Sequence, residues 1–234
     1  MRDKLNEQEW WDVSLELVND SIILWKNELA ETSDNDYHGL QSSYTFLWAD
    51  YLKKIRLLYS SGAGLEEIKA IFPEFVSCFE KSWTNEFGYV ELIWAVSIGI
   101  MLEISSDAMQ PLQDLVQRDN YSDYLLDFMF NSIDPSWKRT SNEFNDPNPY
   151  EALRIVIESQ SSQEAIKSLK DYLSKKWYKG HNDMGWYNSH KKSNYVGYWS
   201  FESGAIAKIL KLDDTGWENE KYYPYDMVHY NDNK

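Results

Sequence analysis

The sequence is poor in cysteine, in long apolar runs and in basic residues, and each shortage excludes a class of protein. Cys78 is the single cysteine in 234 residues, so no disulfide can form within the chain. The longest apolar stretch, residues 89–104, is interrupted by glutamates and a serine and is shorter than the roughly 20 apolar residues of a membrane span. The first residues hold no apolar signal core. We therefore expect a soluble cytoplasmic protein that does not bind membranes.

Basic residues are too few to balance the acidic ones. The chain has 23 Lys and Arg against 38 Asp and Glu, a formal net charge of −15. Residues 1–146 carry 26 acidic and 11 basic residues, whereas residues 147–234 carry 12 of each, so the whole net charge lies in the first part. An acidic protein repels nucleic acid and attracts cationic partners. We therefore predict no nucleic-acid binding.

Aromatic and apolar residues are abundant. They make up 16% and 43% of the chain, enough to bury a large core without disulfides or a metal. Apolar residues recur at spacings of four and three, which is typical of amphipathic helices, and no sustained period-two alternation occurs. The clearest stripe consists of Trp11, Leu15, Val18, Ile22, Trp25 and Leu29. The predicted fold class is all-α, either a multi-helix bundle or stacked antiparallel helix pairs.

Turn residues divide the chain into expected helices and domains. A second helix ends at the glycines at positions 62 and 64, and a third starts near Leu65 and is kinked or split by Pro73. Further helices are expected over residues 89–104, 112–116, 121–133, 149–159, 166–180 and 197–210. Prolines, Asn and Asp without periodicity predict a linker at 135–148, between an acidic N-terminal helical domain (1–134) and a C-terminal helical domain (149–234).

Catalytic motifs are missing from the sequence. It has no phosphate-binding loop, dinucleotide glycine fingerprint, zinc-protease helix or nucleophile elbow. His181, with Asp183 and His190 nearby, could begin a metal site, but the spacing matches no known motif. We predict that the protein is not an enzyme and has no cofactor. Two alternatives stay open: a small helical metal-dependent hydrolase and a helical protein-interaction scaffold.

Two sets of acidic residues have the spacing of one helix face. The first acidic stripe consists of Asp12, Glu16 and Asp20, at i, i+4 and i+8. The second acidic stripe has the same spacing and consists of Asp119, Asp123 and Asp127. Like charges four residues apart destabilise an isolated helix by about 0.2–0.5 kcal/mol per pair. Each stripe is therefore either a solvated face that keeps the protein soluble or a contact surface for a basic protein.

The most distinctive part of the sequence is an aromatic region near the C-terminus. It consists of YVGYWSFESGAIAKIL at residues 195–210 and YYPYDMVH at residues 222–229. The first segment places Tyr198, Trp199 and Glu202 on one predicted helix, as an aromatic cluster with a hydrogen-bonded carboxylate. Small residues that permit close helix approach follow at Gly204, Ala205 and Ala207.

These two segments, preceded by Trp186-Tyr187 and His190-Lys191, resemble the C-terminal domain of the PoNi immunity proteins. Those proteins are the partners of PoNe-type DNase toxins in bacterial polymorphic toxin systems, including systems delivered by type VI secretion. The resemblance implies a cytoplasmic all-α protein that binds and neutralises a cognate DNase without catalysis. We expect the motif residues to be structural rather than toxin contacts: Tyr195, Gly197, Tyr198, Trp199, Glu202, Tyr223, Pro224, Tyr225 and Asp226.

The charge of the chain agrees with such a partner. A DNase must present a basic cleft to phosphates, and an acidic helical face docked there would exclude DNA by charge and sterics. Discrimination among toxins belongs on a variable surface rather than in a shared core. We therefore place the toxin-binding surface on the two acidic stripes.

Overall fold

The computed structural model describes residues 1–232, and the described chain is all-α, as predicted. It forms two compact units. The first consists of residues 1–87 and 190–197, and the second consists of residues 88–189 and 198–232 of the described chain. Among the described helices, none is both long enough and apolar enough to cross a membrane.

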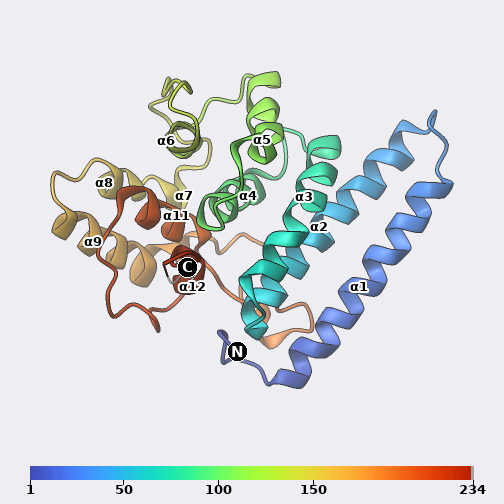
Figure 1. The fold of residues 1–234 in the computed structure, drawn as a ribbon, viewed down its shortest axis with the longest axis horizontal. Helices are drawn as coiled ribbons and strands as arrows, with labels where there is room; N and C mark the ends of the chain where they lie inside the picture. Colours follow the sequence, from blue (N-terminus) through green and yellow to red (C-terminus); the bar gives the residue numbers. More distant parts are fainter. Residues whose placement is uncertain (233–234) are drawn as a thin grey trace. The chain divides into compact units, whose positions relative to one another are not determined.

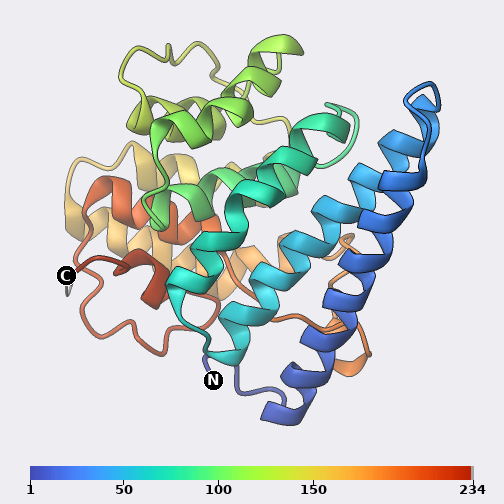
Figure 2. The same cartoon turned by 45° about the vertical axis from the view of Figure 1, so that its right-hand side comes forward.

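Three long helices form most of the first unit: α1 (Gln8–Glu31), α2 (Tyr37–Ser61) and α3 (Leu65–Ser82). The α2 helix lies between the other two, so α1 is an outer helix of this unit (Figure 1 and Figure 2). The side of α1 that faces α2 buries Trp11, Val18 and Ile22. Near the far end of α1, Trp25 stacks on Phe46 of α2 with ring centroids 4.1 Å apart.

The ends of these helices follow from local chemistry. Asp36 caps the start of α2, because its Oδ1 accepts a hydrogen bond at 2.9 Å from the backbone N–H three residues further on. Gly62 ends α2 in the left-handed conformation, with φ of +93°, as the glycine pair predicted. Pro73 does not split α3, which is one continuous helix. Phe72 and Phe75, on either side of this proline, are both fully buried.

A segment from far along the chain completes the first unit. Residues 190–197 belong to it, and Ser60 Oγ donates a hydrogen bond to the carbonyl oxygen of Val196 at 2.9 Å. The hydroxyl of Tyr195 donates to the carboxylate of Asp3, near the start of the chain. The first unit is therefore built from both the beginning of the chain and a later segment.

Shorter helices form the second unit. They are α4 (Tyr89–Met101), α5 (Ser106–Arg118), α6 (Tyr124–Ile133), α7 (Pro147–Tyr150), α8 (Leu153–Ile157), α9 (Ser162–Asp171), a π-helical segment (Tyr172–Trp177), α10 (Tyr178–Gly180), α11 (Phe201–Leu210) and α12 (Tyr225–Val228). A 3₁₀ turn at Ser189–Lys191 begins at the last residue of this part of the second unit and continues into the segment that belongs to the first. The α4 helix is buried nearly all round, as predicted, and α5, α6, α11 and α12 pack against it.

The helix predicted for residues 197–210 begins at Phe201 instead. Gly197 has φ of +98°, a left-handed conformation that interrupts a right-handed helix. The N–H of Ser200 donates to the carbonyl oxygen of Tyr222 at 2.8 Å rather than to a helical carbonyl. The prediction that three motif residues share one helix is therefore wrong, since Tyr198 and Trp199 precede α11 and Glu202 lies in it.

Two other expected segments differ in detail. Residues 149–159, predicted as one helix, contain part of α7 and the separate helix α8. The predicted linker, residues 135–148, lies inside the second unit, where most of it is a loop after α6. Whether residues 1–134 and 149–234 fold as separate domains stays a prediction.

The α11 helix approaches its neighbours as closely as its small residues predicted. A Cβ atom placed on Gly204 would lie 2.5 Å from Met101 Sδ, 2.6 Å from Pro224 Cγ and 3.0 Å from Val228 Cγ2. These distances are well below the contact distance of about 3.5–4.0 Å between nonbonded carbon atoms. Glycine is therefore required at this position by packing against α4 and α12.

We expect the substitution Gly204→Ala to lower the free energy of unfolding by about 1–3 kcal/mol, because overpacking outweighs the better helix propensity of alanine. Urea denaturation measures the change. Gly185→Ala is the control, since no atom lies within 4 Å of a Cβ placed there. Equal stability of the two variants would contradict the packing argument.

Candidate binding surface

The first acidic stripe lies on the exposed side of α1, as its spacing predicted. Asp12, Glu16 and Asp20 are all exposed. Asp12 accepts a hydrogen bond from Gln8 Nε2 at 2.8 Å, and none of the three carboxylates forms an ion pair with another residue of the described chain. The whole of α1 contains six acidic residues and one basic residue. This face is therefore negative and is not neutralised locally.

A line of exposed aliphatic side chains, not predicted from the sequence, runs beside this stripe. Val13, Leu17 and Leu24 are 49%, 62% and 60% exposed. At about 100° per residue, their spacing places them within about 40° of one another around the helix, next to Asp20. We call these three residues the apolar ridge. The spacing is visible in the sequence, but the exposure follows only from the position of α1 as an outer helix (Figure 1).

The second acidic stripe is not a helix face. Asp119 follows the last residue of α5, Asp123 is the N-cap of α6, and Asp127 lies within α6. The chain turns between the first two because Asn120 has φ of +48°. Asp123 and Asp127 are buried, and Asp119 pairs with neighbouring Arg118 at 2.7 Å. The prediction that these three carboxylates form one exposed surface is therefore wrong.

Asp127 instead anchors the loop that follows α6 through hydrogen bonds. Its carboxylate accepts hydrogen bonds from Trp137 Nε1 at 2.8 Å, from the N–H of Thr140 at 2.7 Å and from the N–H of Ser141 at 2.9 Å. A buried carboxylate is tolerated only when hydrogen bonds replace its lost hydration. The loop supplies those donors, so the charge and the loop stabilise each other.

Asp123 has a similar role at the start of α6. It accepts hydrogen bonds from the N–H groups of Leu125 and Leu126 at 2.9 Å, from the N–H of Asn145 at 2.8 Å and from the hydroxyl of Tyr89 at 2.8 Å. Burial raises the pKa of Asp123, and these hydrogen bonds oppose the shift. The carboxylate joins α4, α6 and the loop from within and has no surface left for a partner.

The C-terminal motif residues lie in both units, and most are buried. Gly197 is in the first unit, where its carbonyl oxygen accepts a hydrogen bond from Arg56 Nη2 at 3.0 Å. Tyr198 is in the second unit, with its ring centroid 5.2 Å from that of Tyr178 and 5.8 Å from that of Trp186. The buried members are Tyr195, Gly197, Tyr198, Trp199, Glu202, Tyr223 and Pro224, whereas Tyr225 is partly exposed and Asp226 is exposed.

Glu202 is a fully buried carboxyl group in the first turn of α11. Its Oε1 accepts hydrogen bonds from Ser200 Oγ at 2.7 Å and from the hydroxyl of Tyr172 at 3.0 Å. Ser200 Oγ also lies 2.6 Å from Ser203 Oγ, which extends the network. Burial raises the pKa of Glu202 to about 7, because hydroxyl groups compensate the charged form less than a cation would.

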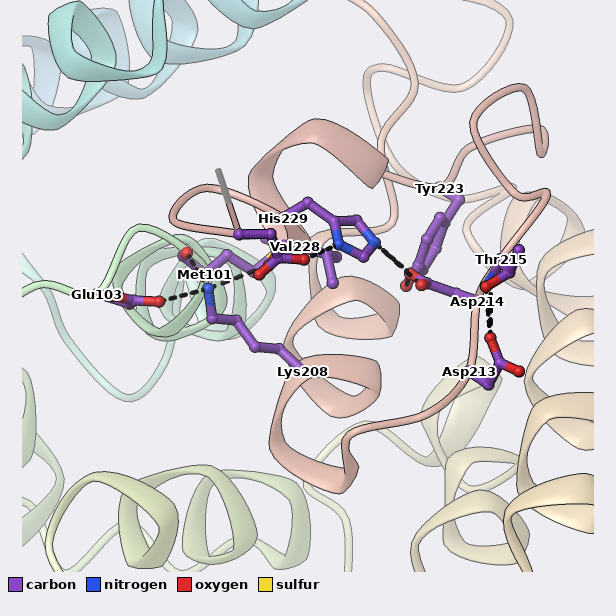
Figure 3. Close-up of polar contacts among 10 residues, drawn as sticks. Met101, Glu103, Lys208, Asp213, Asp214, Thr215, Tyr223, Val228 and His229 are labelled. Carbon is purple, nitrogen blue, oxygen red and sulfur yellow. Dashed lines mark hydrogen bonds and ion pairs between the residues drawn. The ribbon is translucent and has the colours of Figure 1, made fainter. Parts of the chain in front are cut away.

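A lysine ties the ends of two helices to α11 (Figure 3). Lys208 Nζ donates hydrogen bonds at 3.0 Å to the carbonyl oxygens of Met101, at the end of α4, and of Val228, at the end of α12. The same ammonium pairs with Glu103 at 2.9 Å. Carbonyl groups at the end of a helix lack intrahelical donors, and a lysine satisfies them well.

Asp214 holds the aromatic segment that follows α11 (Figure 3). Its Oδ2 accepts a hydrogen bond from the hydroxyl of Tyr223 at 2.6 Å, and its Oδ1 lies 2.9 Å from His229 Nε2. His229 Nδ1 contacts the carboxylate of Asp232. Partial burial lowers the pKa of His229, but the two carboxylates outweigh this effect and raise the pKa above its usual value.

Both ring nitrogens of His181, the histidine considered for a metal site, have hydrogen-bond partners within the chain. His181 Nε2 lies 2.9 Å from the hydroxyl of Tyr150, and Nδ1 lies 2.7 Å from the carbonyl oxygen of Trp177. Burial lowers the pKa of His181 to about 4, so the ring is neutral at pH 7. Within residues 1–232, no group of three or more His, Cys, Asp or Glu side chains is arranged to hold a metal ion.

The chain is thus an all-α protein with an exposed, acidic outer helix in its first unit. A family model described as PoNe immunity protein (PoNi), N-terminal, matches residues 2–114, and one described as PoNe immunity proteins (PoNi), C-terminal, matches residues 121–227. The chain belongs to the PoNi family of immunity proteins, which confirms the resemblance.

The crystal structure of protein PA2201 from Pseudomonas aeruginosa matches with a TM-score of 0.76 and 16% sequence identity, over 98% of this chain and 89% of that chain. Identity this low shows a shared fold alone. No curated protein matches the chain.

We expect Asp127→Asn to lower the free energy of unfolding by about 2–3 kcal/mol, because an amide cannot accept at both oxygen positions and leaves a buried donor unpaired. Hydrogen exchange at the backbone amides of Thr140 and Ser141 should become faster. Asp119→Asn is the matched control from the same predicted stripe, and its exposed ion pair predicts a loss of less than about 1 kcal/mol. Both are measured by urea denaturation, and similar losses would contradict the anchoring role.

The raised pKa of Glu202 predicts a dependence of stability on pH. In the folded state Glu202 keeps its proton up to about pH 7, whereas the ordinary pKa of glutamate is 4.5. The contribution of this group to the free energy of unfolding is therefore complete below pH 4.5 and is lost as the pH rises toward 7. Between pH 5.5 and pH 8.5 the wild type should lose about 2 kcal/mol more than Glu202→Gln, which cannot ionise. Denaturation of both proteins at the two pH values measures this difference. Parallel losses would show that Glu202 titrates normally.

Proposed function

We propose that this protein is a cytoplasmic immunity protein that binds and neutralises a cognate PoNe-type DNase, delivered by type VI secretion or a related polymorphic toxin system. Membership of the PoNi family supports this function. Inhibition requires only that the complex form, so the protein acts without catalysis and without a cofactor. The observation that carries the proposal is the first acidic stripe, whose carboxylates are exposed on an outer helix and not neutralised by nearby cations.

Charge complementarity explains how this stripe would act. A DNase needs a basic surface to bind phosphates, and an acidic helix is attracted to the same surface. Asp12, Glu16 and Asp20 are spaced one turn apart, so their charges extend along the helix, as phosphate charges extend along a DNA strand. Such complementarity increases the rate of association and disfavours wrong partners. With α1 docked there, DNA is excluded by both charge and volume.

The first experiment tests binding and inhibition together. The chain is co-expressed with the nuclease encoded beside it, complex formation is followed by size-exclusion chromatography, and DNA cleavage is measured with and without the chain. A stoichiometric complex with lost cleavage supports the immunity function. Absence of a complex with cleavage unaffected would contradict it for this toxin, and metal analysis of the purified protein would then test the hydrolase alternative.

A charge reversal tests the role of the first acidic stripe. We expect the triple variant Asp12→Lys, Glu16→Lys and Asp20→Lys to lower the association rate constant about tenfold or more, with a weaker dependence on salt concentration. Surface plasmon resonance at low and moderate ionic strength measures both effects.

The matched control reverses three exposed acidic residues on another helix of the same unit, Glu67, Glu74 and Glu80 on α3. It changes the net charge by the same amount but leaves α1 intact. If both triple variants slow association equally, only the net charge matters, and the first acidic stripe is not the docking surface.

A further inference from the structure

The outer face of α1 is not uniformly acidic, and its apolar part needs an explanation. Val13, Leu17 and Leu24 stay about half to three-fifths exposed, although each is a large aliphatic side chain. A helix face selected only for solubility would carry polar residues at these positions. Single exposed aliphatic residues are common, but these three lie within about 40° of one another on the side of α1 away from α2 and are not scattered singly.

The arrangement of the ridge and the stripe matches the usual design of a protein interface. Interfaces have an apolar centre that becomes fully buried and a polar or charged border. On α1 the apolar ridge runs beside Asp20 and Glu16 on the same exposed face. A fourth exposed aliphatic residue, Ile23, is 57% exposed and projects among the acidic side chains. Glu28 lies close to the other side of the ridge in the helical projection.

We infer that the apolar ridge is the anchor of the toxin complex, and that it is buried against an apolar strip on the nuclease that is bordered by Lys and Arg. This inference rests on the proposed function and adds the chemistry of the partner surface. A second copy of this chain is the less suitable occupant, because ridge-to-ridge pairing would bring two acidic helices together. Each α1 holds six acidic residues and one basic residue, so that pairing is repulsive.

The two parts of the face then control different rates. Charges at the edge of an interface act mainly on the encounter and therefore on the association rate constant. Apolar side chains buried at its centre act mainly on the lifetime of the complex and therefore on the dissociation rate constant. The first acidic stripe thus guides the nuclease to α1, and the apolar ridge holds it there.

The test is the double variant Leu17→Ala and Leu24→Ala, which removes most of the ridge and keeps good helix formers on an exposed surface. We expect the dissociation rate constant of the complex with the neighbouring nuclease to rise about tenfold or more. The association rate constant should stay within about threefold of wild type. Circular dichroism and thermal unfolding confirm that the variant is folded, and surface plasmon resonance gives both rate constants.

Ile155→Ala is the matched control, because Ile155 is 64% exposed on α8 in the second unit. It should leave both rate constants unchanged. If the complex forms but the ridge variant dissociates at the wild-type rate, the ridge is not the anchor and the proposed function is unaffected. If the wild-type protein forms no complex with the nuclease, the proposed function itself is contradicted.

Light scattering of the free protein tests whether a second copy of this chain covers the apolar ridge. We expect wild type to be monomeric at micromolar concentration. A wild-type dimer that becomes monomeric in the ridge variant would overturn the inference, because the ridge would then bind a second copy of the chain.

Discussion

The second unit depends on the burial of α4, a helix with almost no exposed face. Such a helix needs neighbours on all sides, and α5, α6, α11 and α12 provide them. Gly204 lets α11 approach closely, and Lys208 satisfies the carbonyl groups at the ends of α4 and α12. Small side chains and one well-placed cation therefore make the close packing around α4 possible.

Much of the fold could be predicted from periodicity. The stripe from Trp11 to Leu29 correctly predicted a long first helix, and the apolar run from residue 89 correctly predicted a buried helix. Contacts between distant segments could not be predicted in this way. Ser60 bonds to Val196, 136 residues away, and no local pattern indicates that residues 190–197 return to the first unit. The start of α11 at Phe201 could not be predicted either. It depends on the left-handed conformation of Gly197, which a glycine permits but does not require.

The two acidic stripes show why spacing alone did not define the candidate site. Whether a carboxylate is exposed depends on the other residues of its helix. On α1 the fully buried residues share one face, so Glu16 lies on the opposite, exposed side. Residues 124–130 are all buried instead, so a carboxylate at position 127 has no exposed side to occupy. Asp123 is also a favourable N-cap residue directly before an apolar run, a signal for a helix start that conflicts with a continuous stripe.

Under the proposed function, recognition and folding would rely on different residues of this protein. Glu202 and Gly204 are enclosed by neighbouring side chains, so most substitutions there would disturb the core. Leu17 and Asp20 are exposed on an outer helix, where substitutions change stability by only about 0.5 kcal/mol. If α1 binds the toxin as proposed, its exposed residues can change without loss of the fold. That separation would suit the proposed immunity function, because the specificity of binding could diverge while the buried residues around α11 stay unchanged.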